Sequence, residues 1–193
     1  MLTPTIGNLA VGHHKGVKVE LLPGNQIFAY AGDQGQGARF KFIAEGRHDE
    51  ILQALRPIDY SVRISKEIIE QLHSTGISLD RIDVATILAF IHDEKPQSCI
   101  FEGPLQPRLL DSRHYYATLG TGKQFADPFL RFLIDTFCPR GQPNVADARF
   151  LATWTLRHVI DTNPGGVADP IKMAVIGTSP GHACFASNGG TSS

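Results

Sequence analysis

Long apolar runs, cysteine and an excess of charge of one sign are all scarce in this sequence. No segment approaches 18 consecutive apolar residues, and no basic region followed by an apolar run opens the chain, so we expect a protein that neither spans a membrane nor is exported. Three widely spaced cysteines argue against a disulfide framework and make a reducing cytoplasm the simplest setting. A formal net charge of -1, with scattered basic residues, favours neither nucleic acid nor an anionic membrane as a partner.

Metal-binding and nucleotide-binding patterns are also missing. The eight histidines show no H-x-x-x-H or H-E-x-x-H spacing. The stretch from Gly32 to Gly37 does not follow the dinucleotide order G-x-G-x-x-G, and Gly120 to Lys123 fails the phosphate-loop pattern at residues 117 and 124. We therefore expect no metal and no cofactor.

The composition, 42% hydrophobic and 19% charged, suits one compact domain, which we place at residues 1–178 with a flexible tail over residues 179–193. Two apolar runs around Pro23-Gly24-Asn25 predict a hairpin. Further along, Ile64, Ile68 and Leu72 recur at helical spacing. Short runs at residues 84–91, 98–102, 106–110 and 114–119 predict a strand meander.

Two more helices and a final strand complete the order. Five residues recur at spacings of three and four in the first of these helices, and we interpret them as core: Phe125, Phe129, Phe132, Leu133 and Phe137. The second helix follows Asn144, and the strand covers residues 171–176. Because the helices come in sequential pairs between blocks of strands, the sequence predicts an α+β fold, a four-layer αββα sandwich of two antiparallel sheets.

Three groups of motifs occur in a characteristic order. The first group consists of Thr5-Ile6-Gly7-Asn8, Lys18-Val19 and Gln26 to Gly32. The second is His114 to Gly122. The third consists of Asp161, Gly165-Gly166 and Ile171 to Ile176. In this order they resemble the proteasome β-subunit and HslV family of N-terminal nucleophile hydrolases, over residues 5 to about 177. The resemblance implies the αββα sandwich and threonine-type peptidase chemistry.

In that family the hydroxyl of an N-terminal threonine is the nucleophile, and its own α-amine, with a pKa of about 7.7 to 8.0, accepts the proton. The resemblance implies three site residues here. Lys18 matches the family lysine whose charge lowers the pKa values of the threonine amine and hydroxyl. Thr121 matches the residue whose hydroxyl hydrogen-bonds that amine. Asp161 matches the residue whose carboxylate orients the N-terminus. Each also has a structural interpretation: a solvent-facing strand lysine, a helix-capping turn residue and a polar helix end.

The sequence also departs from the family pattern. Lys15 is a nearby competitor of Lys18, and Pro164 stands where the family has a serine. Only four residues precede the T-x-G turn, so Thr3, followed by Pro4, is too close to it to begin a first strand and return. We therefore expect this chain to lack the nucleophile, either as a truncated product of a longer reading frame or as a non-catalytic relative.

Two functional hypotheses follow from the resemblance. The first is a threonine-type peptidase that acts on peptides or unfolded proteins inside a ring-like homo-oligomer, possible partners including an ATP-dependent unfoldase. The second is a non-catalytic assembly subunit of such a ring.

Overall fold

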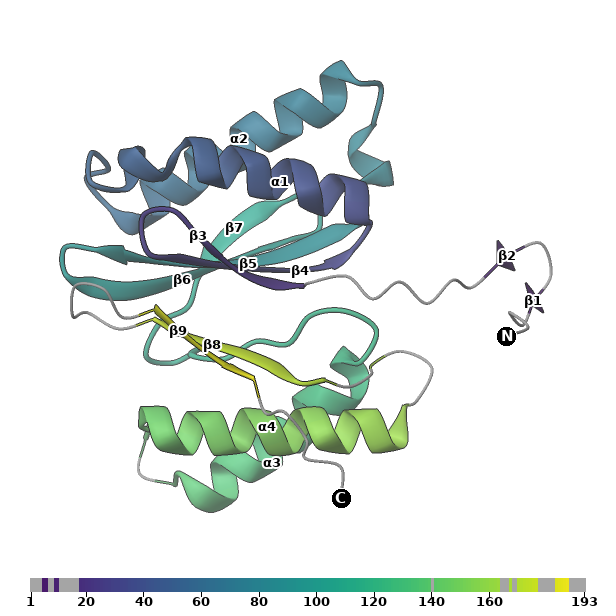
Figure 1. The fold of residues 1–193 in the computed structure, drawn as a ribbon, viewed down its shortest axis with the longest axis vertical. Helices are drawn as coiled ribbons and strands as arrows, with labels where there is room; N and C mark the ends of the chain where they lie inside the picture. Colours follow the sequence, from purple (N-terminus) through teal and green to yellow (C-terminus); the bar gives the residue numbers. More distant parts are fainter. Residues whose placement is uncertain are drawn as a thin grey trace.

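The largest sheet of the protein has five antiparallel strands, in the order β3-β4-β5-β6-β7 (Figure 1). The computed structural model describes residues 5–6, 9–10, 18–139, 141–163, 167, 170–176 and 183–187. The strands are β3 (Val19–Leu22), β4 (Gln26–Gly32), β5 (Val84–His92), β6 (Lys95–Glu102) and β7 (Gln106–Leu109). Each strand pairs with the next along the chain, which confirms the predicted hairpin at residues 23–25 and most of the predicted meander.

One face of this sheet is covered by α1 (Gln34–Gly46) and α2 (Pro57–Ser74) (Figure 1). The short 3-10 helix η1 (His48–Ile51) lies between them, and η2 (Leu79–Arg81) precedes β5. Asp33 starts α1 because its Oδ1 accepts a hydrogen bond from the Gln36 N–H at 2.8 Å. Pro57 suits the first turn of α2, where a backbone N–H is not needed.

The main core lies between these helices and the sheet. Ile64, Ile68 and Leu72 face it from α2 and are fully buried, as their spacing predicted. Large aromatic side chains from both helices and from the sheet fill the rest of this core: Phe28, Phe40, Tyr60, Phe90 and Phe101. Full burial of such a side chain contributes about 1.5–3 kcal/mol, so this cluster is the principal source of stability.

The remaining elements lie beyond the opposite face of the sheet (Figure 1). They are the helices α3 (Lys123–Phe137) and α4 (Val145–Thr162) and the strands β8 (Lys172–Ile176) and β9 (Ala183–Ser187), which pair antiparallel. The β8–β9 pair lies between the sheet and the two helices, and β9 falls within the predicted tail. Two short strands near the N-terminus, β1 (Thr5–Ile6) and β2 (Leu9–Ala10), pair with each other.

The predicted four-layer αββα sandwich of two antiparallel sheets is wrong. The described residues form a single five-stranded sheet with helices, and the second β layer consists of the β8–β9 pair alone. Helices in sequential pairs are compatible with either arrangement, so the order of elements could not establish how many strands the second layer has.

The strand expected at residues 114–119 is one reason for this difference, because that segment is irregular. Asp111 Oδ1 accepts hydrogen bonds from the backbone N–H groups of His114 and Arg113, at 2.7 and 2.8 Å. These bonds, His114 first, lower the pKa of Asp111. They make a turn that uses a backbone donor which a strand would need for its ladder.

The core interpretation of the α3 phenylalanines is also wrong in part. Leu133 is fully buried, but Phe132 and Phe137 are more than half exposed. Within the described part of the chain, no helix is long and apolar enough to cross a membrane.

Candidate functional site

Lys18 lies exposed directly before β3. Its backbone carbonyl accepts a hydrogen bond from the Tyr30 N–H at 3.2 Å, which extends the β3–β4 ladder by one residue. This bond fixes the backbone of Lys18 beside the last residues of β4. The competing Lys15 lies outside the described residues.

Thr121 lies in the turn that leads into α3, between two glycines in tight surroundings. Gly120 has φ +87°, which favours glycine, and a Cβ added there would lie 3.0 Å from Cβ of Ala31. A Cβ at Gly122 would lie 2.8 Å from Cγ1 of Val159. The turn therefore packs between the end of β4 and the end of α4. Gly122, and not Thr121, is the N-cap of α3, so the helix-capping interpretation of Thr121 is not supported.

Asp161 lies exposed in the last turn of α4, two residues after the buried Val159. Its carboxylate is close to the helix C-terminus, where the macrodipole is negative and a carboxylate is unfavourable. The last turn of α4, which is described in full, holds no basic residue. Helix stability alone therefore does not account for an acid at this position.

A series of contacts joins the three segments that carry these residues. The Lys18 backbone bonds to Tyr30, the neighbouring Ala31 meets the Gly120 turn, and Gly122 meets Val159 of α4. In Figure 1 the end of β4, the start of α3 and the end of α4 lie at the same end of the molecule. The structure thus brings the three backbone segments into one region, with the side chains of Lys18, Thr121 and Asp161 all exposed. Pro164 and Gly165-Gly166 lie outside the described residues.

A neighbouring polar pair was not predicted from the sequence. The Thr118 hydroxyl donates a hydrogen bond to the Asp127 carboxylate and so ties the segment before the turn to the first half of α3. Lys123, the first residue of α3, pairs with Glu102 of β6 at 3.1 Å. Thr118 lies within the His114 to Gly122 motif and Lys123 directly after it, but nothing in the sequence indicated Asp127 and Glu102 as their partners.

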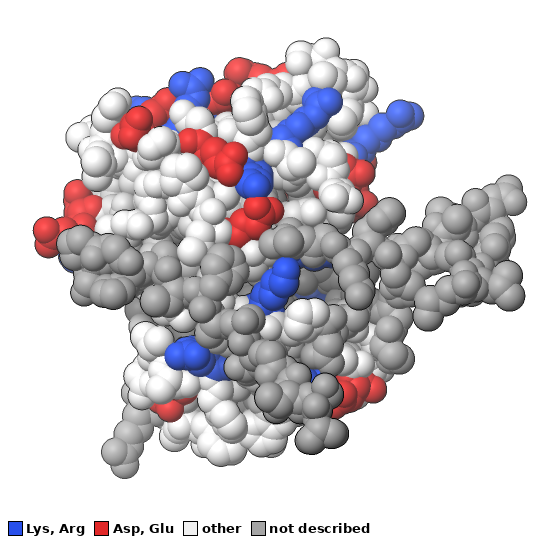
Figure 2. Space-filling view, viewed as in Figure 1, with Lys and Arg blue, Asp and Glu red and all other residues white. Residues whose placement is uncertain are grey.

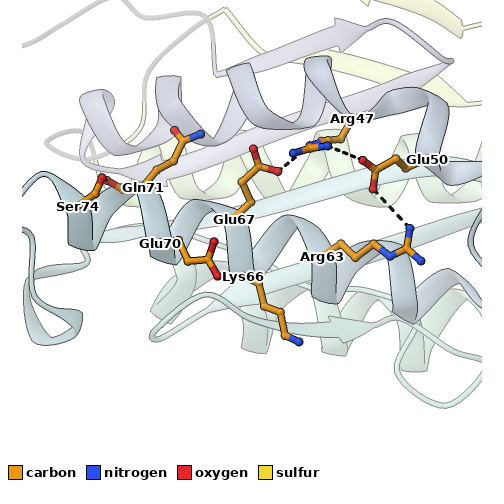
Figure 3. A pocket seen from close by; sticks show the side chains of 8 residues that line it. All are labelled: Arg47, Glu50, Arg63, Lys66, Glu67, Glu70, Gln71 and Ser74. Atoms are coloured by element: carbon orange, nitrogen blue, oxygen red, sulfur yellow. Dashed lines mark hydrogen bonds and ion pairs between the residues drawn. The ribbon is translucent and has the colours of Figure 1, made fainter.

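A separate hollow of about 600 Å³ lies along α2 (Figure 3). Its charges largely neutralise one another: Arg47 bonds Glu67 at 2.7 Å and Glu50 at 2.8 Å, and Arg63 lies 3.6 Å from Glu50. The hydrogen bond to Glu67, followed by that to Glu50, raises the pKa of Arg47. We interpret this hollow as an exposed ion-pair network. Within the described ranges, no group of three or more His, Cys, Asp or Glu side chains could hold a metal ion.

No protein-family model matches the sequence, and no curated protein gives a significant match. Solved structures do match. Anbu from Hyphomicrobium sp. strain MC1 has a TM-score of 0.66 at 14% identity, over 96% of this chain and 80% of that chain. Anbu, described as an ancestral beta-subunit, from Yersinia bercovieri has a TM-score of 0.68 at 10% identity, over 88% of this chain and 73% of that chain.

The identification with the proteasome β-subunit and HslV family is therefore wrong at the level of that family. The similar structures named above are Anbu proteins, which are proteasome-like but a distinct family. The motifs that suggested it, such as Ala31-Gly32 and Gly120-Thr121-Gly122, meet backbone requirements at turns, so they indicate a fold and do not separate its branches. At these identities the comparison establishes a proteasome-related fold and no specific activity.

Proposed function

We propose that this protein is a proteasome-related subunit in which Lys18, Thr121 and Asp161 surround the place of an N-terminal threonine, as threonine-type peptide-bond hydrolysis requires. The observation that carries the proposal is the series of contacts from Lys18 through Tyr30 and Ala31 to the Gly120 turn and Val159. The contact of Ala31 with Gly120 joins segments about 90 residues apart in the sequence.

The three residues have distinct roles in this proposal. The Lys18 ammonium favours the deprotonated forms of a nearby amine and hydroxyl, which lowers their pKa values. The threonine hydroxyl gives its proton to its own α-amine as its oxygen attacks the peptide carbonyl. Thr121 hydrogen-bonds that amine, and the Asp161 carboxylate attracts it when it is protonated. An acid that is unfavourable for its own helix suits such a role.

Peptides or unfolded proteins are the proposed substrates. When it is expressed from Met1, the 193-residue chain presents no N-terminal hydroxyl, so it is the negative control in an assay with fluorogenic peptides, with and without a threonine-directed covalent inhibitor. Inhibitor-sensitive cleavage by this chain would contradict the proposed nucleophile. Reading the gene upstream of Met1 is the complementary test: an in-frame threonine followed by a strand and an aspartate supports the peptidase.

Variants of a longer product that carries this threonine test the roles directly. Lys18→Ala should lower kcat at least about a hundredfold, since it removes the charge that activates the nucleophile. Lys66→Ala, which removes an exposed lysine on α2, is the matched control and should leave kcat unchanged. Equal kcat values for the two variants would reject the assignment of Lys18.

A non-catalytic assembly subunit is the second candidate. The exposure of Lys18, Thr121 and Asp161 favours it, because catalytic groups are usually at least partly desolvated. Both candidate functions, the peptidase and the assembly subunit, require that the chain assembles with copies of itself in a ring. The peptidase would also have an ATP-dependent unfoldase as a partner. One similar structure, Anbu from Yersinia bercovieri, is an ancestral beta-subunit, and the word subunit supports assembly. A stop codon directly upstream of Met1 supports this second candidate.

A further inference from the structure

His92 is a buried titratable side chain that lies away from the candidate site. It ends β5, and only 4% of it is exposed. Because β5 runs antiparallel to β4, with Val84 opposite Gly32, His92 lies at the end of the sheet opposite to the Gly120 turn (Figure 1). The charge of a histidine ordinarily changes at about pH 6.5, so the partners of this ring decide what a change of pH does there.

Both ring nitrogens of His92 face acceptors. Nε2 lies 2.9 Å from the backbone carbonyl oxygen of Ala54, and Nδ1 lies 3.4 Å from Oδ2 of Asp93. A carbonyl oxygen cannot donate, so Nε2 carries the proton of the bond to Ala54. In the neutral ring Nδ1 then has only a lone pair, which faces a second acceptor. The imidazolium form alone offers an N–H group to both partners.

The two partners belong to different surface segments. The bond to Ala54 attaches the connection between η1 and α2, residues 52–56, to the sheet. The two leucines of this connection do not anchor it, because Leu52 and Leu55 are 87% and 92% exposed. Asp93 begins the two-residue turn between β5 and β6, and its side chain is 85% exposed. One ring therefore lies between the turn and the connection, with a nitrogen toward each.

We propose that His92 is a proton-sensitive clasp between the β5–β6 turn and the η1–α2 connection. The bond to Ala54 is present in both states of the ring. When Nδ1 gains a proton, its N–H group donates to the Asp93 carboxylate, and one side chain joins the two segments. When Nδ1 loses that proton, the carboxylate is released to water. The order of the connection that carries the two leucines therefore follows pH. The clasp goes beyond the proposed function and does not depend on it.

The other charges around His92 leave Asp93 as the group that favours its proton. Lys95 lies directly opposite His92 on β6 and disfavours a positive ring, but it is exposed, so water and salt screen it. Burial raises the pKa of Tyr60 on α2, so this side chain stays uncharged. The charged side chains of η1 and the start of α2 pair with one another: Asp49 with His48, Glu50 with Arg47 and Arg63, and Asp59 with Arg56. Figure 2 likewise shows side chains of both signs over the α1 and α2 layer.

NMR of the imidazole nitrogens tests the first step. At about pH 8 His92 should be the neutral tautomer with its proton on Nε2, and at about pH 5.5 both nitrogens should carry a proton. The signals that disappear in His92→Gln are those of His92. A neutral ring with its proton on Nδ1, or a ring that is still neutral at about pH 5.5, would overturn the clasp.

Hydrogen exchange of the backbone amides tests the second step. Protection factors, which correct for the intrinsic effect of pH on exchange, should rise about threefold at residues 53–55 between about pH 8 and about pH 5.5. The amide of Leu88, in the middle of β5, is the internal reference. Asp93→Gly should abolish the rise, because it removes the carboxylate while glycine keeps the positive φ of 49°.

Glu94→Gly is the matched control. Glu94 is the other residue of the turn, is also exposed and has a φ of 59°, so the same substitution removes a carboxylate that does not face the ring. The rise in protection should persist in this variant. A rise that survives in Asp93→Gly, or that Glu94→Gly abolishes equally, would reject the clasp, as would equal protection at both pH values. If circular dichroism shows that His92→Gln does not fold, the two turn variants still decide the question.

Discussion

Gly122 approaches Val159 so closely that a Cβ at residue 122 would lie 2.8 Å from Cγ1 of that valine. Val159 is almost fully buried near the end of α4, and it cannot move without disturbing the packing of that helix. The turn that contains Thr121 and the last turn of α4 are therefore held in a fixed relation. Within the series of contacts described above, the contact of Gly122 with Val159 is the one that connects Thr121 with Asp161.

Gly122→Ala should lower the free energy of unfolding by about 1–3 kcal/mol, as overpacking of a tight site does. Gly46→Ala is the control, because a Cβ there meets nothing within 4 Å and glycine is a poor helix residue. It should leave the free energy of unfolding unchanged or raise it. Urea unfolding of both variants measures the difference, and equal stabilities would contradict the close approach.

The strongest local patterns in the sequence predicted their elements well. Pro23-Gly24-Asn25 predicted the first hairpin, and the four-residue spacing of Ile64 and Ile68 predicted the buried face of α2. These features depend on neighbours in the sequence, which a single chain displays directly.

Features that depend on distant partners could not be predicted in this way. The outer position of α3 exposes Phe132, although its spacing is that of a core residue. The Asp111 turn, which replaces the strand expected at residues 114–119, is local, but the apolar run that follows it led to the strand prediction. The meeting of Gly120 with Ala31 depends on contacts about 90 residues apart. The sequence suggested the three candidate residues through a resemblance, and it gave no indication of how exposed their side chains are.

Asp59 should make stability depend on pH. Arg56 donates two hydrogen bonds to its carboxylate, at 2.7 and 3.1 Å, and the Arg56 side chain is the main reason why the pKa of Asp59 is lowered. The stabilisation is present above the unfolded-state pKa of about 3.9 and is lost as the pH falls through the lower folded-state pKa. Titration by NMR should show the Asp59 pKa rising toward its ordinary value in Arg56→Gln. An unchanged pKa in that variant would reject the pair.

Cys99 should resist alkylation in the folded protein. Burial raises the pKa of its thiol to about 11, so only about one molecule in a thousand carries the thiolate at pH 8. Cys138 is half-buried and should react with iodoacetamide before Cys99. Peptide mapping by mass spectrometry measures both rates, and urea should bring them together. Equal rates in the folded protein would contradict the burial of Cys99.

Asp161→Asn should raise the free energy of unfolding by about 0.3–1 kcal/mol, because it removes a carboxylate from the negative end of the α4 dipole. Asp147 provides the matched control, since it lies in the first turn of the same helix, where a carboxylate is favourable. Asp147→Asn should therefore lower the free energy of unfolding by a similar amount. Opposite signs in urea unfolding would mean that Asp161 is kept at a cost to its own helix, as a functional carboxylate can be. If Asp161→Asn destabilises the protein as Asp147→Asn does, the carboxylate serves the fold, and its assignment to the site loses this support.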